Sequence, residues 1–156
     1  MIINVLKLLN KETLDYEFRL FQDDLKGYED EYFGKPDESG VLVKGSIKKE
    51  AQNEFLMHFT VSGVIIYPCA RCLDPVAEES VFEFEDVITT EIGAEIIDLV
   101  PYVYECLFIN EPFKVLCDEE CKGLCPSCGA NLNHEECSCE NTADIDPRME
   151  VLKKLL

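Results

Sequence analysis

The stretch EFLMHFTVSGVIIY, residues 54–67, decides the fold class of this chain, because its first half carries an apolar side chain at every second position. A helix would instead repeat its apolar residues every three or four positions. A period of two is typical of a β-strand with one buried face. The residues that follow this period are Phe55, Met57, Phe59 and Val61. We predict one long strand over residues 54–67, with a bulge or bend at Gly63.

The same alternation continues on both sides of this strand. It is carried by Val41, Val43 and Ile47, and then by Phe82, Phe84 and Ile88. Repeated alternation of this kind is typical of an antiparallel sheet, so we predict an α+β fold built on one. The pattern leaves open whether the sheet closes into a barrel. Before it, we expect a strand over residues 2–9, an element of undecided type over residues 14–21 and a loop over residues 22–40.

Two helices are predicted outside the sheet. Asp98 ahead of Pro101 is typical of a helix start, and Asp146-Pro147 is typical of another. Apolar residues at helical spacing follow the first start: Leu99, Tyr102, Val103, Cys106, Leu107 and Ile109. We expect residues 1–116 to form a sheet domain with a helix near residues 101–110. Residues 117–156 are expected to form a cysteine-rich, zinc-binding segment with the short C-terminal helix packed on it.

Composition excludes several classes of protein. The chain has 156 residues, 47% of them hydrophobic, which is too much apolar material for a disordered chain. No apolar run approaches the ~18–20 residues of a membrane span, and the N-terminus does not resemble a signal peptide, so we expect a cytoplasmic protein without membrane contact. The formal charge is -18, from 14 Lys plus Arg against 32 Asp plus Glu. Direct binding to DNA or RNA is therefore disfavoured, because it depends on basic side chains.

The acidic residues are concentrated in one part of the chain. Residues 72–113 contain eleven Asp or Glu and no Lys or Arg. A field of one sign attracts cationic partners such as basic proteins. The alternative is a solvated face that only maintains solubility.

Eight of the nine cysteines fall in closely spaced pairs, which in a reducing compartment indicates metal binding rather than disulfides. They are Cys69, Cys72, Cys117, Cys121, Cys125, Cys128, Cys137 and Cys139. Eight thiolates complete two tetrahedral zinc sites, and a site filled by four thiolates leaves no open position for substrate. We therefore expect one or two structural Zn²⁺ ions. The ninth, Cys106, is expected to be a buried apolar residue.

The grouping of the thiols follows from their spacing. Residues 125–139 supply four thiols within one short segment, so we assign Cys125, Cys128, Cys137 and Cys139 to one site. The other site is then formed by Cys69, Cys72, Cys117 and Cys121. A mixed arrangement, with Cys69 and Cys72 sharing an ion with Cys125 and Cys128, stays open. We favour a role other than metal ligand for His134 and a structural role for His58.

Catalytic alternatives are weak. The sequence C-A-R-C at residues 69–72 could be a redox motif, with Arg71 lowering a thiol pKa, but it follows a strand instead of opening a helix. The sequence lacks a phosphate-binding glycine loop and a hydrolytic triad pattern. We therefore predict that the protein is not an enzyme. A zinc-buffering or metal-handoff protein remains a further alternative.

Two cysteine elements give the chain a family resemblance. The sequence CARCLDP, residues 69–75, resembles the Cys-x-Arg-Cys-Leu-x-Pro element of the YceD family, the large ribosomal RNA subunit accumulation proteins of bacteria and plastids. Residues 116–133, LCDEECKGLCPSCGANLN, resemble its C-terminal cysteine element, and C-S-C at residues 137–139 and D-P-R at residues 146–148 also match. The resemblance covers most of the second half of the chain.

The resemblance implies a role in ribosome biogenesis, namely the accumulation of large-subunit rRNA, without an established catalytic activity. Combined with the charge, it favours action through a basic ribosomal protein or assembly factor, with an indirect association with large-subunit rRNA. The acids of residues 74–111 would face this partner. A zinc-stabilised RNA-binding protein is the alternative, through a basic patch of Lys44, Lys48, Lys49 and Arg71.

Overall fold

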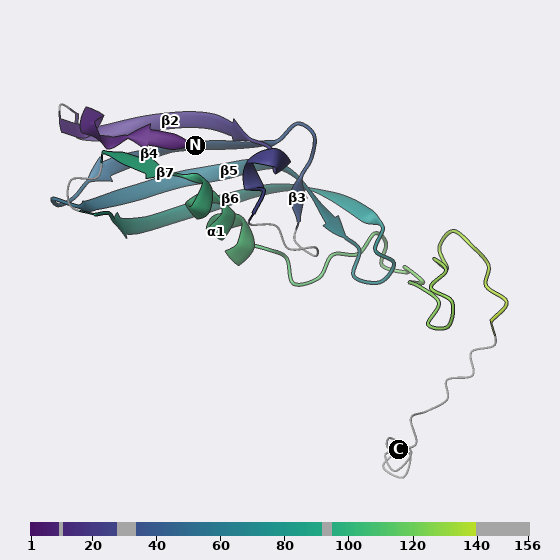
Figure 1. The fold of residues 1–156 in the computed structure, drawn as a ribbon. Coiled ribbons are helices and arrows are strands. Elements are labelled where there is room, and N and C mark those ends of the chain that lie inside the picture. The colour runs from purple at the N-terminus through teal and green to yellow at the C-terminus, as the bar shows by residue number, and fades with distance from the viewer. Residues whose placement is uncertain (10, 28–33, 92–94, 140–156) are drawn as a thin grey trace, which may run out of the picture.

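The sheet is the centre of the computed structural model, which describes residues 1–9, 11–27, 34–91 and 95–139 (Figure 1). Its strands are all antiparallel: β2 (Thr13–Leu20), β4 (Val41–Lys49), β5 (Glu54–Pro68), β6 (Pro75–Thr89) and the short β3 (Lys35–Pro36). The order runs from β2 through β4 to β5, which then pairs with β6. In the described part of the chain β2 and β6 do not pair with each other, so the sheet is open. The predicted antiparallel sheet is confirmed. Within the described residues it does not close into a barrel.

The long strand predicted over residues 54–67 is present and ends one residue later, at Pro68. Its register with β6 continues without interruption through the pair Gly63↔Ser80, so there is no bulge in that ladder. Gly63 has φ +156°, and a Cβ atom there would lie 3.1 Å from the Cα of Val41. The glycine therefore permits close approach of two backbones.

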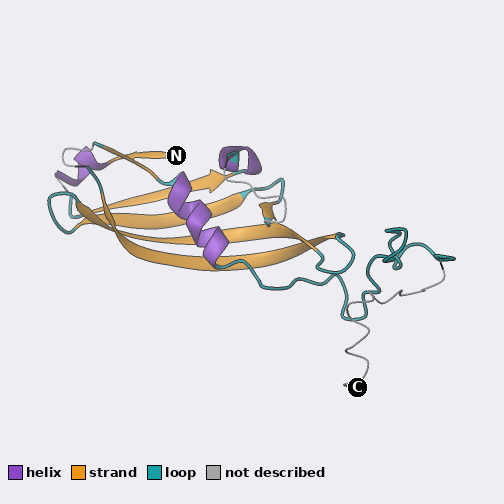
Figure 2. Cartoon of the chain, turned by 60° about the horizontal axis from the view of Figure 1, so that its bottom comes forward, coloured by secondary structure: helices purple, strands orange, loops and turns teal. Residues whose placement is uncertain are grey.

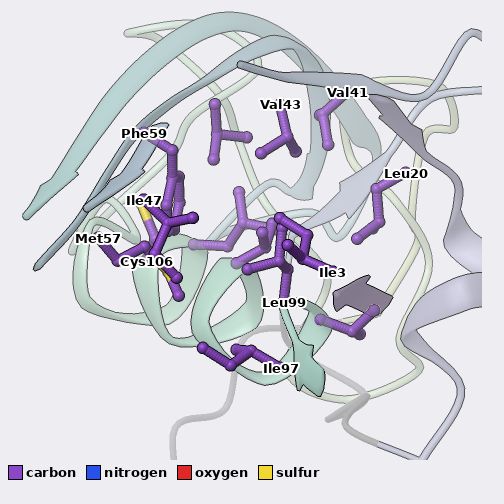
Figure 3. Packing of buried hydrophobic residues seen from close by; sticks show 14 of the residues in the cluster. Ile3, Leu20, Val41, Val43, Ile47, Met57, Phe59, Ile97, Leu99 and Cys106 are labelled. Carbon is purple, nitrogen blue, oxygen red and sulfur yellow. The ribbon is translucent and has the colours of Figure 1, made fainter. Parts of the chain in front are cut away.

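A second layer covers one face of this sheet. It consists of α1 (Val100–Ile109), the two-stranded pair of β1 (Ile2–Asn4) with β7 (Ile96–Asp98), and the 3₁₀ helices η1 (Val5–Leu9) and η2 (Gln22–Leu25). Figure 2 shows α1 lying across the strands. Side chains from both layers form one core, in which Phe59, Leu99 and Cys106 are each 0% exposed (Figure 3). The expectation that Cys106 is a buried apolar residue is confirmed.

The predicted helix is present, with one error in its buried face. Pro101 lies in the first turn, and Asp98 Oδ1 accepts a hydrogen bond of 3.2 Å from the backbone N–H of Val100. Val103, Cys106 and Leu107 are buried as expected, but Ile109 is 67% exposed. Ile109 is the last residue of α1, and its neighbours Phe108 and Asn110 are exposed as well.

Other differences concern the N-terminal third of the chain. The expected strand over residues 2–9 stops at Asn4 and continues as η1, and residues 14–21 form strand β2. Residues 22–40 contain η2 and β3 in addition to loop. Strand β7, which the sequence analysis missed, exists because it pairs with the distant β1. The predicted C-terminal helix lies outside the described residues.

Phe59 is the residue whose loss should cost the core most. Its ring stacks on that of Phe84 on β6, with centroids 4.8 Å apart. We expect Phe59→Ala to lower the free energy of unfolding by about 3–5 kcal/mol, because it leaves a cavity that the two layers cannot close. Urea denaturation measures this. The matched control, Phe113→Ala, removes a fully exposed ring and should change stability by less than about 0.5 kcal/mol; equal losses would contradict this assignment of the core.

Candidate metal centre

The fold brings the eight paired cysteines into two groups of four. Within each group the sulfur atoms all lie within 4.8 Å of one another, and either group could hold a metal ion. The first group is Cys69, Cys72, Cys117 and Cys121, and the second is Cys125, Cys128, Cys137 and Cys139. This is the grouping predicted from spacing, and the mixed arrangement is not the one observed. His134 belongs to neither group.

The first group is built where two distant segments meet. Cys69 and Cys72 lie in the turn that joins β5 to β6, and Cys117 and Cys121 lie in the segment that follows α1. The backbone N–H of Ala70 donates to the carbonyl of Val115 at 2.8 Å and joins the two segments. Cys69, Cys72 and Cys121 are 5% exposed or less, whereas Cys117 is exposed, so three of the four thiols are shielded from solvent.

The distances between the sulfur atoms fit one small ion. A zinc ion with bonds of about 2.3 Å to four tetrahedral thiolates separates the sulfurs by about 3.8 Å. In the first group Cys69 Sγ lies 3.8 Å from Cys121 Sγ, and Cys72 Sγ lies 3.5 Å from Cys117 Sγ. The donor set therefore fits a thiophilic, tetrahedral metal such as zinc.

Hydrogen-bond donors point at these sulfurs. Cys69 Sγ accepts from the backbone N–H groups of Arg71 and Cys117, at 3.5 and 3.4 Å. Burial raises the pKa of Cys69, but these donors lower it by more, to about 6. Asn133 Nδ2 donates to Cys121 Sγ at 3.2 Å. These donors stabilise thiolates, the form that binds metal.

Arg71 fixes the loop that carries the second pair of thiols. Its Nη1 donates to the backbone carbonyls of Glu119 and Cys121, at 3.1 and 2.9 Å. From the sequence, Arg71 is a candidate for a role in a redox motif and for one in an RNA-binding patch. In the structure it holds the Cys117–Cys121 loop against the hairpin turn.

Asp74 links the first cysteine group to residues 125–139. The sequence did not predict this role. The Asp74 carboxylate accepts from Asn131 Nδ2 at 3.0 Å for both oxygens, and it lies 2.9 Å from His134 Nε2. The Asn131 amide, followed by His134 and the Cys72 thiol, holds the pKa of Asp74 below its usual value. Cys72 Sγ donates to Asp74 at 3.3 Å. Metal binding would require the Cys72 thiolate, which has no proton to donate, and Asn131 and His134 would then still hold the carboxylate.

The second group lies in the loop that projects beyond the end of the sheet in Figure 1. Cys137 Sγ lies 3.3 Å from Cys125 Sγ and 3.5 Å from Cys128 Sγ. The backbone N–H groups of Cys128 and Ser127 are the main cause that lowers the pKa of Cys125, to about 6. Two thiols of this group, Cys128 and Cys139, are exposed, whereas the first group has one exposed thiol, that of Cys117.

The two Cys-x-x-Cys turns have the same backbone geometry. In the first, Cys69 N–H donates to Asp74 O and Leu73 N–H donates to Cys69 O; in the second, Cys125 N–H donates to Ala130 O and Gly129 N–H donates to Cys125 O. Leu73 and Gly129 thus occupy equivalent positions, with φ of +63° and +76°. A left-handed conformation is free for glycine but costs leucine about 1–2 kcal/mol.

The charged residues do not form the surfaces predicted from the sequence. Lys44 pairs with Glu17, and Lys48 pairs with Glu50. Both lysines lie on the outer face of the sheet, the face that the second layer does not cover. Lys48 is opposite Leu56 on β5, twelve residues before Pro68, so Arg71 lies about 40 Å further along the hairpin. The predicted basic patch is therefore not one surface.

The acids of residues 74–111 are also divided. Asp74 lies in the metal centre, and Asp98 forms an ion pair of 3.0 Å with the N-terminal amine. The exposed acids that remain together are on β6, where Glu79, Glu83 and Glu85 share the outer face of the sheet. On that face Glu85 is opposite the exposed His58, for which a structural role was expected.

Leu73→Gly should stabilise the protein. We expect the free energy of unfolding to rise by about 1 kcal/mol, because glycine removes the strain of the left-handed conformation and the lost side chain is 58% exposed. Chemical denaturation in zinc-containing buffer measures this. Gly129→Ala is the matched control: a Cβ there meets nothing within 4 Å, so strain alone should destabilise that turn by about 1 kcal/mol. A loss of stability in Leu73→Gly would contradict the interpretation.

Comparison with known proteins identifies the family. A family model described as "Large ribosomal RNA subunit accumulation protein YceD" matches residues 83–156. Uncharacterized protein YlbN of Bacillus subtilis is 31% identical over 134 residues, which cover 76% of this chain and 75% of that protein. No solved structure matches the chain. Among the described residues, none of the helices has the length and apolar character of a membrane span.

Two other relatives differ from the chain in length. An uncharacterized protein of Mycobacterium tuberculosis is 30% identical over 135 residues, and the match spans 76% of this chain but 64% of that relative. A protein of Arabidopsis thaliana, named "Large ribosomal RNA subunit accumulation protein YCED homolog 1, chloroplastic", is 31% identical over 61 residues, which cover 39% of this chain and 19% of that protein. These matches agree with the resemblance of the cysteine elements, and the chain belongs to the YceD family.

Proposed function

We propose that this chain is a non-enzymatic, cytoplasmic ribosome biogenesis factor that supports accumulation of large-subunit rRNA by binding a basic ribosomal or assembly protein. The family description supports the connection with large-subunit rRNA. The observation that carries the proposed mode of action is the row of exposed acids on β6, in a chain of formal charge -18. Such a surface repels the phosphates of RNA and attracts Lys and Arg side chains.

Zinc has a structural role in this proposal. Four thiolates complete a tetrahedral shell, so neither group leaves an open position where water or substrate could be activated. An ion in the first group would join the hairpin turn to the segment after α1. An ion in the second would organise residues 125–139, which have little apolar core of their own. The division into a sheet domain, residues 1–116, and a zinc-binding segment, residues 117–156, is part of the same proposal, with the first site crossing the boundary.

Metal counting by native mass spectrometry tests the two sites. We expect two zinc ions on the reduced chain, one on Cys72→Ser and one on Cys128→Ser. The double variant Cys69→Ser, Cys117→Ser distinguishes the groupings, because both residues belong to the first group and one ion should remain. Loss of both ions would support the mixed arrangement, and fewer than two ions on the unmodified chain would contradict the proposal.

The second group also permits a different function. Because two of its thiols are exposed, against one in the first group, an incoming ligand could reach an ion there more easily than an ion in the first group. Fast transfer of one of the two ions to a chelator weaker than the protein would favour metal handoff. Retention of both ions would favour the structural role.

Charge reversal tests the acidic surface. In a strain depleted of the protein we expect the ratio of large-subunit to small-subunit rRNA to fall, and the unmodified chain to restore it. Glu79, Glu83 and Glu85 changed together to Lys should fail to restore it, because the surface would then repel a basic partner. The matched control changes the same number of exposed acids elsewhere, Glu12, Glu38 and Glu54, and should restore the ratio.

Binding to purified large-subunit ribosomal proteins, tested one at a time, gives a second readout of the same surface. The affinity should fall steeply as salt is added, since exposed charges are screened beyond about 10 Å at 0.1 M ionic strength. An rRNA ratio that is unchanged on depletion would overturn the proposed function. Binding that is indifferent to salt would overturn the proposed mode of action.

A further inference from the structure

A groove of about 590 Å³ lies beside the first cysteine group. One wall is the end of the hairpin and the other is the segment that follows α1, and the Ala70–Val115 backbone hydrogen bond joins them. Its lining is mostly apolar and includes Pro68, Leu73, Phe108, Pro112, Phe113 and Val115. Because Cys69 also contributes to the lining, the groove and the metal centre share one wall.

Several large apolar side chains of this groove are presented to solvent. Phe113 is fully exposed, and Leu73 and Phe108 are 58% and 57% exposed. Single exposed apolar residues are ordinary on protein surfaces, but several around one groove are typical of a binding site.

The groove also has an acidic side. Tyr67, which lines it, has its pKa raised to about 12, first by burial and then by the negative charges of Glu111 and Glu78. Glu111 lines the groove, and Lys114 is the one cation in its lining. Since Glu111 and Lys114 offset each other in the lining, the preference for a positively charged occupant comes from Glu78 near Tyr67 and from the chain's formal charge of -18.

Leu73 is the residue that distinguishes this groove from an incidental surface hollow. It occupies the turn position where the equivalent Gly129 meets no strain, and it adopts φ +63° as the only described residue other than glycine with a positive φ. Most of its side chain contacts solvent, so packing within the described chain does not offset the strain. Strain of this kind is characteristic of functional positions. A contact between the Leu73 side chain and another molecule would offset this strain.

We propose that this groove binds a protein segment in which apolar side chains alternate with Lys or Arg, with Leu73 and Phe113 as its apolar anchors. The inference rests on the proposed function, because it names the surface that would recognise a basic partner beside the acids of β6. A second copy of this chain is disfavoured as the occupant, since two chains of charge -18 repel each other.

The first experiment measures binding of a defined probe, a short fluorescent peptide of alternating Leu and Lys, by fluorescence anisotropy at near-physiological salt. We expect Leu73→Gly to weaken binding about tenfold although it stabilises the fold, and Leu73→Met to restore binding. The matched control is Ile96→Ala, a similarly exposed apolar residue on β7 outside the groove, and this variant should bind as the unmodified chain does. Unchanged affinity in Leu73→Gly would overturn the proposal, as would equal binding of a matched peptide with Glu in place of Lys.

The second experiment tests whether the groove is covered by the chain itself. A photo-crosslinking phenylalanine analogue at position 113 should crosslink to the Leu-Lys peptide and be competed by unlabelled peptide. Residues 148–156, R-M-E-V-L-K-K-L-L, have the same mixture of apolar and basic residues. Crosslinking of position 113 to this segment in the chain alone, without competition by peptide, would overturn the proposal.

The rRNA assay separates failure of this inference from failure of the proposed function. If depletion lowers large-subunit rRNA and Leu73→Gly restores it fully, the proposed function stands and the groove proposal is overturned. If depletion leaves the ratio unchanged while Leu73 still governs peptide binding, the proposed function is overturned and the groove stands as a binding site. Failure of Leu73→Gly, but not of Ile96→Ala, to restore the ratio supports both.

Discussion

The unbroken register between β5 and β6 is the constraint on which both the sheet and the metal centre depend. The strands pair from Glu54↔Thr89 to Pro68↔Pro75, so the turn between them must begin at Cys69. A slip of one residue would turn the buried face of β5 toward solvent, which makes this register strongly specified. Burial of apolar side chains along the strand thereby places two thiols at its end, opposite the segment that carries the other two.

Four neighbouring thiolates are electrostatically unfavourable, and hydrogen-bond donors around them offset part of this cost. Thiolates repel one another, and the buried ones also lose contact with water. Backbone N–H groups at Cys69 and the Asn133 amide at Cys121 supply partial positive charge, while Arg71 holds the carbonyls of the facing loop. These groups stabilise the four thiolates that a bound metal ion would require.

The turn at residues 69–74 contributes to both the first cysteine group and the groove beside it. Its geometry requires a left-handed residue after the second cysteine, which the second turn meets with Gly129 and the first with Leu73. In the first turn the chain accepts strain and leaves a large apolar side chain in solvent, beside a groove with acidic groups on one side. Stability and binding place opposite demands on such a position, as is common at functional sites. The end of the β5–β6 hairpin therefore forms part of both the candidate metal centre and the groove.

Local patterns along the chain were enough to predict part of the structure. Alternating apolar residues predicted the long strand, proline and aspartate predicted the start of α1, and the spacing of the cysteines predicted two groups of four and the family resemblance. Features that depend on distant partners could not be predicted in this way: β7 exists because β1 pairs with it, and the sheet is open because β2 and β6 do not meet in the described chain. The tertiary structure also places Arg71 and Lys48 far apart and joins Asp74 to Asn131 and His134. Sequence periodicity records which face a residue buries, whereas these contacts arise only after chain segments dozens of residues apart have packed together.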